Sequence, residues 1–100
     1  MITRDPNRLP GRATHPGEIL LHEFLAPLGI TQARFAAHLK TSVQRINEIV
    51  KGKRSVTAET AWLLSEALGT TPQFWINLQA TYDLVTQRPT HHVKPIKRAS

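Results

Sequence analysis

The segment from residue 31 to residue 56, TQARFAAHLKTSVQRINEIVKGKRSV, constrains the fold of this chain more than any other. Apolar residues recur at helical spacing on either side of a short polar stretch, which predicts two short helices joined by a tight connection. Thr31 is suited to cap the first helix, expected at about 32–39. The second is expected to start after Thr41 or Ser42. This arrangement is typical of a helix-turn-helix.

Three further helices are expected around this unit. The first is expected at about 16–26, with Pro16 in its first turn and Pro27 and Gly29 ending it. The second is expected at about 58–68, capped by Thr57 and ended by Gly69. The third opens at Thr71 and Pro72 and ends before Pro89. Their apolar residues follow helical spacing, and no segment shows the alternation of a strand. The predicted fold is therefore all-α: a five-helix domain with a long C-terminal helix.

Composition places this domain in a small, basic protein. The chain has 100 residues, no cysteine and a net charge of +6, which suits one domain in a reducing cytoplasm. No apolar run approaches the roughly 20 residues that cross a membrane. Residues 1–14 are expected to form a flexible arm, 15–88 the domain, and 89–100 a basic disordered tail. Six of the Lys and Arg residues, against one Glu, lie in 31–57, a concentration typical of polyanion binding.

The second helix of the segment has two faces. When residues are placed about 100° apart, Ile46, Ile49 and Val50 face the core, and the helix is expected to end at Gly52. The remaining side chains could read base edges in the major groove. These candidate base-reading residues are Val43, Gln44, Arg45, Asn47 and Glu48. The alternative is that they form only the solvent side of an amphipathic helix.

The chemistry of these side chains indicates what each could contact. Gln44 could bind adenine, Arg45 guanine or a phosphate, and Val43 a thymine methyl group. Glu48 could accept from a cytosine amine or instead pair with Lys51. Phosphate contacts would supply most of the affinity. The candidate phosphate-contacting residues are Gln32, Ser42, Lys51, Lys53 and Arg54.

Four stretches of the sequence resemble one protein family. They are HPGEILLHEFL (15–25), PLGITQ (27–32), RINEIVKGKRSVTAETAWLL (45–64) and ALGTTPQFWINLQATYDL (67–84). Over about residues 14–86 the chain resembles the HigA-type antitoxins, lambda-repressor-like (XRE) helix-turn-helix proteins of bacterial toxin–antitoxin pairs.

The resemblance implies binding to double-stranded operator DNA, repression of its own operon, and neutralisation of a RelE-like mRNA-cleaving toxin. It also implies base-reading positions at Val43, Gln44 and Glu48, with Arg45 and Asn47 beside them. Gln32, Lys53 and Arg54 match phosphate-contacting positions.

Lys40 departs from the usual pattern of such a connection. A glycine commonly follows the leucine there, because a left-handed residue ends the first helix. A lysine in that conformation costs about 1 kcal/mol relative to glycine, although it adds positive charge near DNA.

The C-terminal helix carries more apolar surface than one small core requires. Phe74, Trp75, Leu78, Tyr82 and Val85 form a stripe suited to packing on the helices at 16–26 and 58–68. A second stripe lies almost opposite, which suggests a protein partner. We interpret it as a homodimer surface suited to a palindromic operator. Its residues are Ile76, Ala80 and Leu84.

The toxin-binding surface is left open between three candidates. They are the arm (1–14), the first helix with Glu18 and Glu23, and the basic tail. A ribonuclease that grips RNA should be cationic, which favours an acidic surface on its antitoxin.

Catalytic and metal-binding patterns are weak. His22-Glu23 begins like the zinc-peptidase HExxH, but residue 26 is Ala, and His91-His92 lies in the tail. Trp62 and Trp75 are expected to be packing residues rather than platforms for bases. We therefore expect no enzyme and no cofactor or metal. The alternatives to an antitoxin are a stand-alone XRE-family regulator without a toxin, and an interaction protein whose helix-turn-helix no longer binds DNA.

Overall fold

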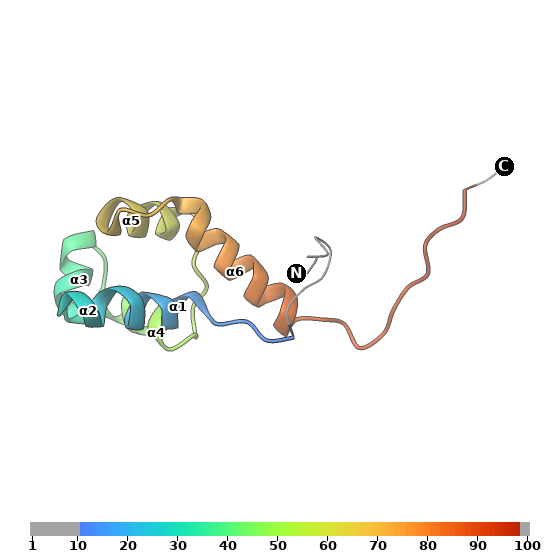
Figure 1. Ribbon diagram of the computed structural model, residues 1–100, viewed down its shortest axis with the longest axis horizontal. Helices are drawn as coiled ribbons and strands as arrows, with labels where there is room; N and C mark the ends of the chain where they lie inside the picture. Colours follow the sequence, from blue (N-terminus) through green and yellow to red (C-terminus); the bar gives the residue numbers. More distant parts are fainter. Residues whose placement is uncertain (1–10, 99–100) are drawn as a thin grey trace, which may run out of the picture.

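A computed structural model describes residues 11–98, and all regular structure in that range is helical (Figure 1). The elements are α1 (Pro16–Ile19), the π-helix η1 (Leu20–Leu25), α2 (Ala26–Leu28), α3 (Gln32–Leu39), α4 (Val43–Val50), α5 (Ala58–Leu68) and α6 (Pro72–Thr86). Because α1, η1 and α2 follow one another without a break, they form a single N-terminal helix. The predicted all-α, five-helix fold with a long last helix is confirmed.

The N-terminal helix runs further than predicted. The expected end at Ala26 is wrong, because Pro27 lies inside the helix and Gly29 ends it in the left-handed region at φ 65°. Proline has no N–H and its ring crowds the carbonyl four residues earlier. A π turn precedes it, in which the Ala26 N–H donates to the Leu21 carbonyl. Such a wide turn relieves the conflict locally.

Hydroxyl side chains begin the other four helices, as predicted. Each accepts a hydrogen bond from the backbone N–H three residues later, which satisfies a donor that has no partner inside the helix. These N-caps are Thr31 for α3, Ser42 for α4, Thr57 for α5 and Thr71 for α6. The start of α4, which the sequence left between two residues, is thus set by Ser42.

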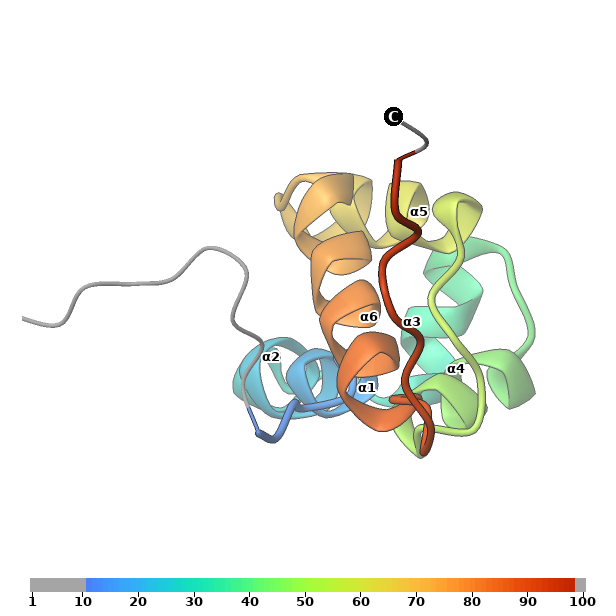
Figure 2. The ribbon, with the colours of Figure 1, turned by 90° about the vertical axis from the view of Figure 1, so that its right-hand side faces the viewer.

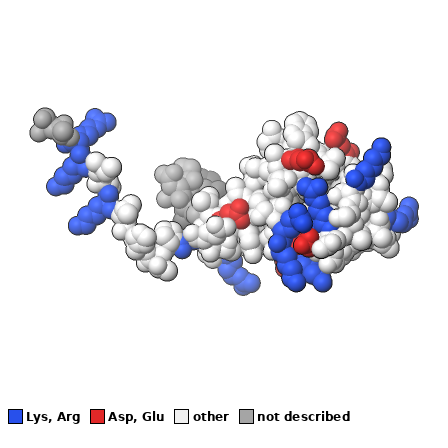
Figure 3. Space-filling model, turned by 180° about the vertical axis from the view of Figure 1, so that it is seen from behind, with Lys and Arg blue, Asp and Glu red and all other residues white. Residues whose placement is uncertain are grey.

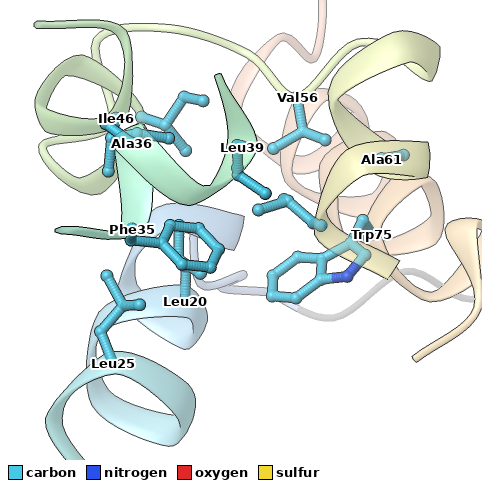
Figure 4. Close-up of a cluster of buried hydrophobic side chains, with 11 residues drawn as sticks. Leu20, Leu25, Phe35, Ala36, Leu39, Ile46, Val56, Ala61 and Trp75 are labelled. Carbon is cyan, nitrogen blue, oxygen red and sulfur yellow. The ribbon is translucent and has the colours of Figure 1, made fainter. Parts of the chain in front are cut away.

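The core lies between the N-terminal helix and α3 to α6 (Figure 4). Trp75 is fully buried and its Nε1 donates to the Thr70 Oγ1 at 2.7 Å. Phe35, Ala36 and Leu39 of α3 are buried in this core as well. Trp62 contradicts its expected packing role, because 60% of its surface is exposed on α5. Tryptophan is usually buried, but Trp62 is exposed because it lies on the outer face of α5.

Two close contacts fix α4 and the connection that follows it. A Cβ at Gly17 would overlap the backbone carbonyl of Ile49, so the N-terminal helix rests directly on the α4 backbone. Gln79, buried in α6, accepts from the Val56 N–H at 2.8 Å and donates to the Asp83 carboxylate at 2.9 Å. These contacts hold both ends of the connection between α4 and α5.

The chain beyond α6 runs away from the helices as an extended segment (Figures 1 and 2). Residues 89–98 are all exposed and form no regular helix or strand. None of the described helices is both long and apolar enough to cross a membrane.

Candidate nucleic-acid interface

The turn between α3 and α4 is closed by a left-handed lysine. Lys40 has φ 59° and is the one residue other than glycine with positive φ in the described part of the chain. Its N–H donates to the Ala37 carbonyl, and the Thr41 N–H donates to the Ala36 carbonyl. This is the hydrogen-bond pattern that ends a helix at a left-handed residue. Lys40, which stands where a glycine is usual, therefore has the left-handed conformation itself.

The exposed start of α4 carries two of the predicted reading residues. Ile46 and Ile49 are buried beneath α4, as expected, and Val50 is half-buried. Val43 is 50% exposed and Gln44 is exposed. Both stand in the first turn, which is the part of a recognition helix that meets base edges.

The other three predicted reading residues contact neighbouring parts of the protein. Asn47 Nδ2 donates to Gln32 Oε1 at 3.0 Å. An Arg45 guanidinium nitrogen lies 3.8 Å from a carboxylate oxygen of Glu59 on α5, a partner that sequence reasoning missed. Glu48 forms an ion pair with Arg54 in the loop after α4.

Glu48 pairs with a different cation from the one expected. Its carboxylate oxygen Oε1 accepts from Nη2 of Arg54 at 2.9 Å and from Nε at 3.3 Å. Lys51, proposed as its partner, is instead the C-cap of α4 and is exposed. The loop after α4 curls back, with the Lys53 N–H donating to the Glu48 carbonyl at 2.8 Å. This curl, rather than helical spacing, brings Arg54 beside Glu48.

Exposed cations follow the C-terminal end of α4. Lys51, Lys53 and Arg54 are exposed in the loop that follows it, and Gln32 is half-buried at the start of α3. Figure 3 shows basic side chains gathered on one part of the folded domain, with an acidic side chain among them. Of the predicted phosphate-contacting residues, Lys51, Lys53 and Arg54 follow α4, Gln32 is hydrogen-bonded to Asn47 within it, and Ser42 caps it.

His15 is a structural residue that sequence reasoning missed. Its Nδ1 accepts from the Gly17 N–H at 2.9 Å and so caps the N-terminal helix. Its ring meets Tyr82 of α6 edge-on, with 4.8 Å between ring centroids, and lies beside Gly52. Burial lowers its pKa from 6.5, against the opposing effects of Asp83 and Glu18. The residue thereby joins the N-terminal helix, the end of α4 and α6.

The two predicted protein-binding surfaces are exposed in the described residues. Ile76 is 37% exposed, Leu84 is 57% exposed, and Ala80 between them is exposed. Glu18 and Glu23 are exposed on the N-terminal helix. Of the predicted arm, residues 1–10 lie outside the described residues. Among residues 11–98, no three His, Cys, Asp or Glu side chains are close enough to hold a metal ion.

Comparison with known proteins identifies relatives for the whole helical domain. A sequence model of the helix-turn-helix family HTH_3 matches residues 21–75. Antitoxin HigA-1 of Vibrio cholerae is 36% identical over 90 residues, covering 85% of each protein. A solved structure of Pseudomonas aeruginosa antitoxin HigA with the higBA promoter matches with a TM-score of 0.79 and 38% identity, over 86% of this chain and all of that one. Antitoxin GraA in complex with its operator matches with a TM-score of 0.80 and 34% identity, over 94% and 100%.

Proposed function

This chain belongs to the helix-turn-helix family HTH_3, and on that premise we propose that it is a HigA-like antitoxin that binds operator DNA through α3 and α4. The observation that carries the proposal is the exposed first turn of α4, together with the exposed cations in the loop that follows the helix. Two relatives with TM-scores near 0.8 were solved with a promoter or an operator. Members of the family are regulators rather than enzymes.

The DNA-binding role has a definite division of labour. Side chains from the first turn of α4 would enter the major groove, while Gln32, Lys51, Lys53 and Arg54 would contact the phosphates on either side. Binding at its own promoter would make the chain an autorepressor. A dimer through Ile76, Ala80 and Leu84 would place two recognition helices about 34 Å apart, one turn of DNA.

The partner is a toxin of the RelE-like, mRNA-cleaving class. Support comes from the resemblance in sequence and from relatives that carry the name antitoxin. The exposed Glu18 and Glu23 suit a cationic ribonuclease. The alternative, a stand-alone XRE-family regulator, keeps the DNA-binding role and lacks the toxin.

A mobility-shift assay with the promoter of its own operon tests the DNA-binding role. Wild type should shift the fragment, and Gln44→Ala should weaken the shift strongly. The matched control is Gln73→Ala, an exposed glutamine on α6 far from α4 in the sequence, which should bind as wild type does. Equal binding by Gln44→Ala and wild type would exclude α4 as the reading helix.

Coexpression tests the toxin partnership separately. A small basic protein encoded beside this chain should copurify with it, and the chain should rescue cells in which that protein arrests growth. Failure of both, together with a normal promoter shift, would favour the stand-alone regulator. Neutralising Glu18 and Glu23 while leaving α4 intact should weaken copurification without changing the promoter shift.

A further inference from the structure

Three of the five residues placed at reading positions of α4 contact other parts of the protein. Asn47 is hydrogen-bonded to α3, Glu48 is hydrogen-bonded to the loop after α4, and Arg45 makes a long ion pair with α5. We propose that α4 reads bases only through the reading pair, Val43 and Gln44, whereas the bracing residues Arg45, Asn47 and Glu48 position α4 and its phosphate contacts. This inference rests on the proposed DNA-binding function and specifies which bases it selects.

The bond from Asn47 orients a phosphate contact. Asn47 donates to the side-chain oxygen of Gln32, and both residues are half-buried. With that oxygen engaged, the amide N–H groups of Gln32 remain as donors at the start of α3, where the backbone N–H groups also favour an anion. Asn47 therefore acts on DNA through Gln32 and contributes no base contact.

Glu48, the one acidic residue of α4, is paired with Arg54. Its Oε1 accepts two hydrogen bonds from Arg54, and charge-assisted bonds of this kind are stronger than neutral ones. Turning this oxygen toward a cytosine amine would release Arg54 and leave the Glu48 carboxylate uncompensated among phosphates. Paired, it offsets that repulsion and holds Arg54 at the edge of the groove.

Arg45 is drawn toward α5. Its side chain is only 28% exposed, its Nε is buried, and its guanidinium faces Glu59 at 3.8 Å. At that distance the ion pair is weak, so burial of the arginine stem between the helices contributes most to its position. A bidentate contact with guanine would require the guanidinium to leave this site.

The reading pair has the opposite character. Val43 is 50% exposed, and the exposed Gln44 side chain has no hydrogen-bond partner in the described part of the chain. An apolar side chain suits the methyl group of thymine, and a glutamine amide suits N6 and N7 of adenine. The geometry thus points to A·T pairs at the positions in each half-site that the first turn of α4 meets.

Binding to a panel of operators tests this division of roles. Each base pair of the promoter site is changed in turn, and affinities are measured for wild type, Val43→Ala, Gln44→Ala, Asn47→Ala and Glu48→Ala. Gln44→Ala should lose the preference for one A·T pair, a discrimination of about 5- to 150-fold for a bidentate contact. Val43→Ala should lose a smaller preference at a neighbouring pair. The bracing variants should change affinity by one common factor on every operator.

A double-mutant cycle separates positioning from general damage. Gln32→Ala and Asn47→Ala cut the same hydrogen bond from opposite sides, so the double variant should bind no more weakly than the worse single variant. Gln32→Ala also serves if Asn47→Ala does not fold, as judged by thermal unfolding. Gln32→Ala should also change the affinity for every operator by the same factor.

The outcomes distinguish this inference from the proposed function. An altered base preference in Asn47→Ala or Glu48→Ala, or an unaltered one in both Val43→Ala and Gln44→Ala, would overturn the assignment of readers. If wild type bound every operator equally well, the proposed function itself would be overturned. This result would come from the wild-type protein alone, without any variant.

Discussion

Replacing Lys40 with glycine should stabilise the domain. The residue sits at φ 59° and ψ 41°, a region that costs a residue with a Cβ about 1–2 kcal/mol. Glycine escapes that cost but loses roughly 0.5–1 kcal/mol through the greater freedom of its unfolded chain. The net gain is about 0.75 kcal/mol at the midpoints of these ranges, equivalent to a rise of roughly 3–6 °C in the melting temperature of a domain this size. Thermal unfolding followed by far-ultraviolet circular dichroism measures it.

The control isolates backbone conformation from charge. Lys40→Ala removes the ammonium group but keeps the Cβ, so its melting temperature should stay close to that of wild type. Both variants lose one cation near the proposed DNA surface and should bind the promoter with the same modest weakening. A Lys40→Gly protein that melts no higher than Lys40→Ala would refute the strain reasoning and leave electrostatics as the effect of this lysine.

Three further changes test how the N-terminal helix, α4 and α6 pack together. Gly17→Ala should cost about 1–3 kcal/mol or more in urea unfolding, because its Cβ has no space, whereas Gly11→Ala, which meets open space, should cost little. Gln79→Leu should cost about 1–3 kcal/mol, since it leaves the buried Val56 N–H without an acceptor. The lowered pKa of His15 means that the unfolded chain takes up its proton first, so stability should fall as pH drops below 6.5 toward the folded value. His15→Asn, which keeps a capping acceptor without titrating there, should lose that part of the pH dependence; an unchanged profile would argue against it.

Helix starts were predictable because the signals are local. Thr31, Thr57 and Thr71 each cap the helix that begins at the next residue, through a hydrogen bond from the N–H three residues later. Gly69 ends α5 in the left-handed region. The bonds involved span few residues, so sequence spacing describes them completely. The strained conformation at Lys40 was foreseen for the same reason.

Features that depend on packing were not predictable in this way. Helical spacing could not show that a π turn would carry the first helix through Pro27. Residue type suggested burial for Trp62, which is exposed, and gave no reason to expect burial of Gln79. Burial of the Gln79 side chain is tolerated because its amide bonds the N–H of Val56, which is distant in the sequence. Such pairings are set by how the helices pack rather than by local spacing.

The candidate interface shows the same limit at the level of single side chains. Helical periodicity separated the core face of α4 from its outer face, but it could not distinguish among the outer residues as candidates for reading bases. What distinguishes them is whether a partner from another element, such as Gln32 or Arg54, already holds the side chain. An atom that is already hydrogen-bonded must give up that bond before it contacts a base, and the lost bond offsets part of the free energy of the base contact. Position in a recognition helix therefore defines which side chains can reach the groove, and the bonds within the protein decide which of those are free to discriminate.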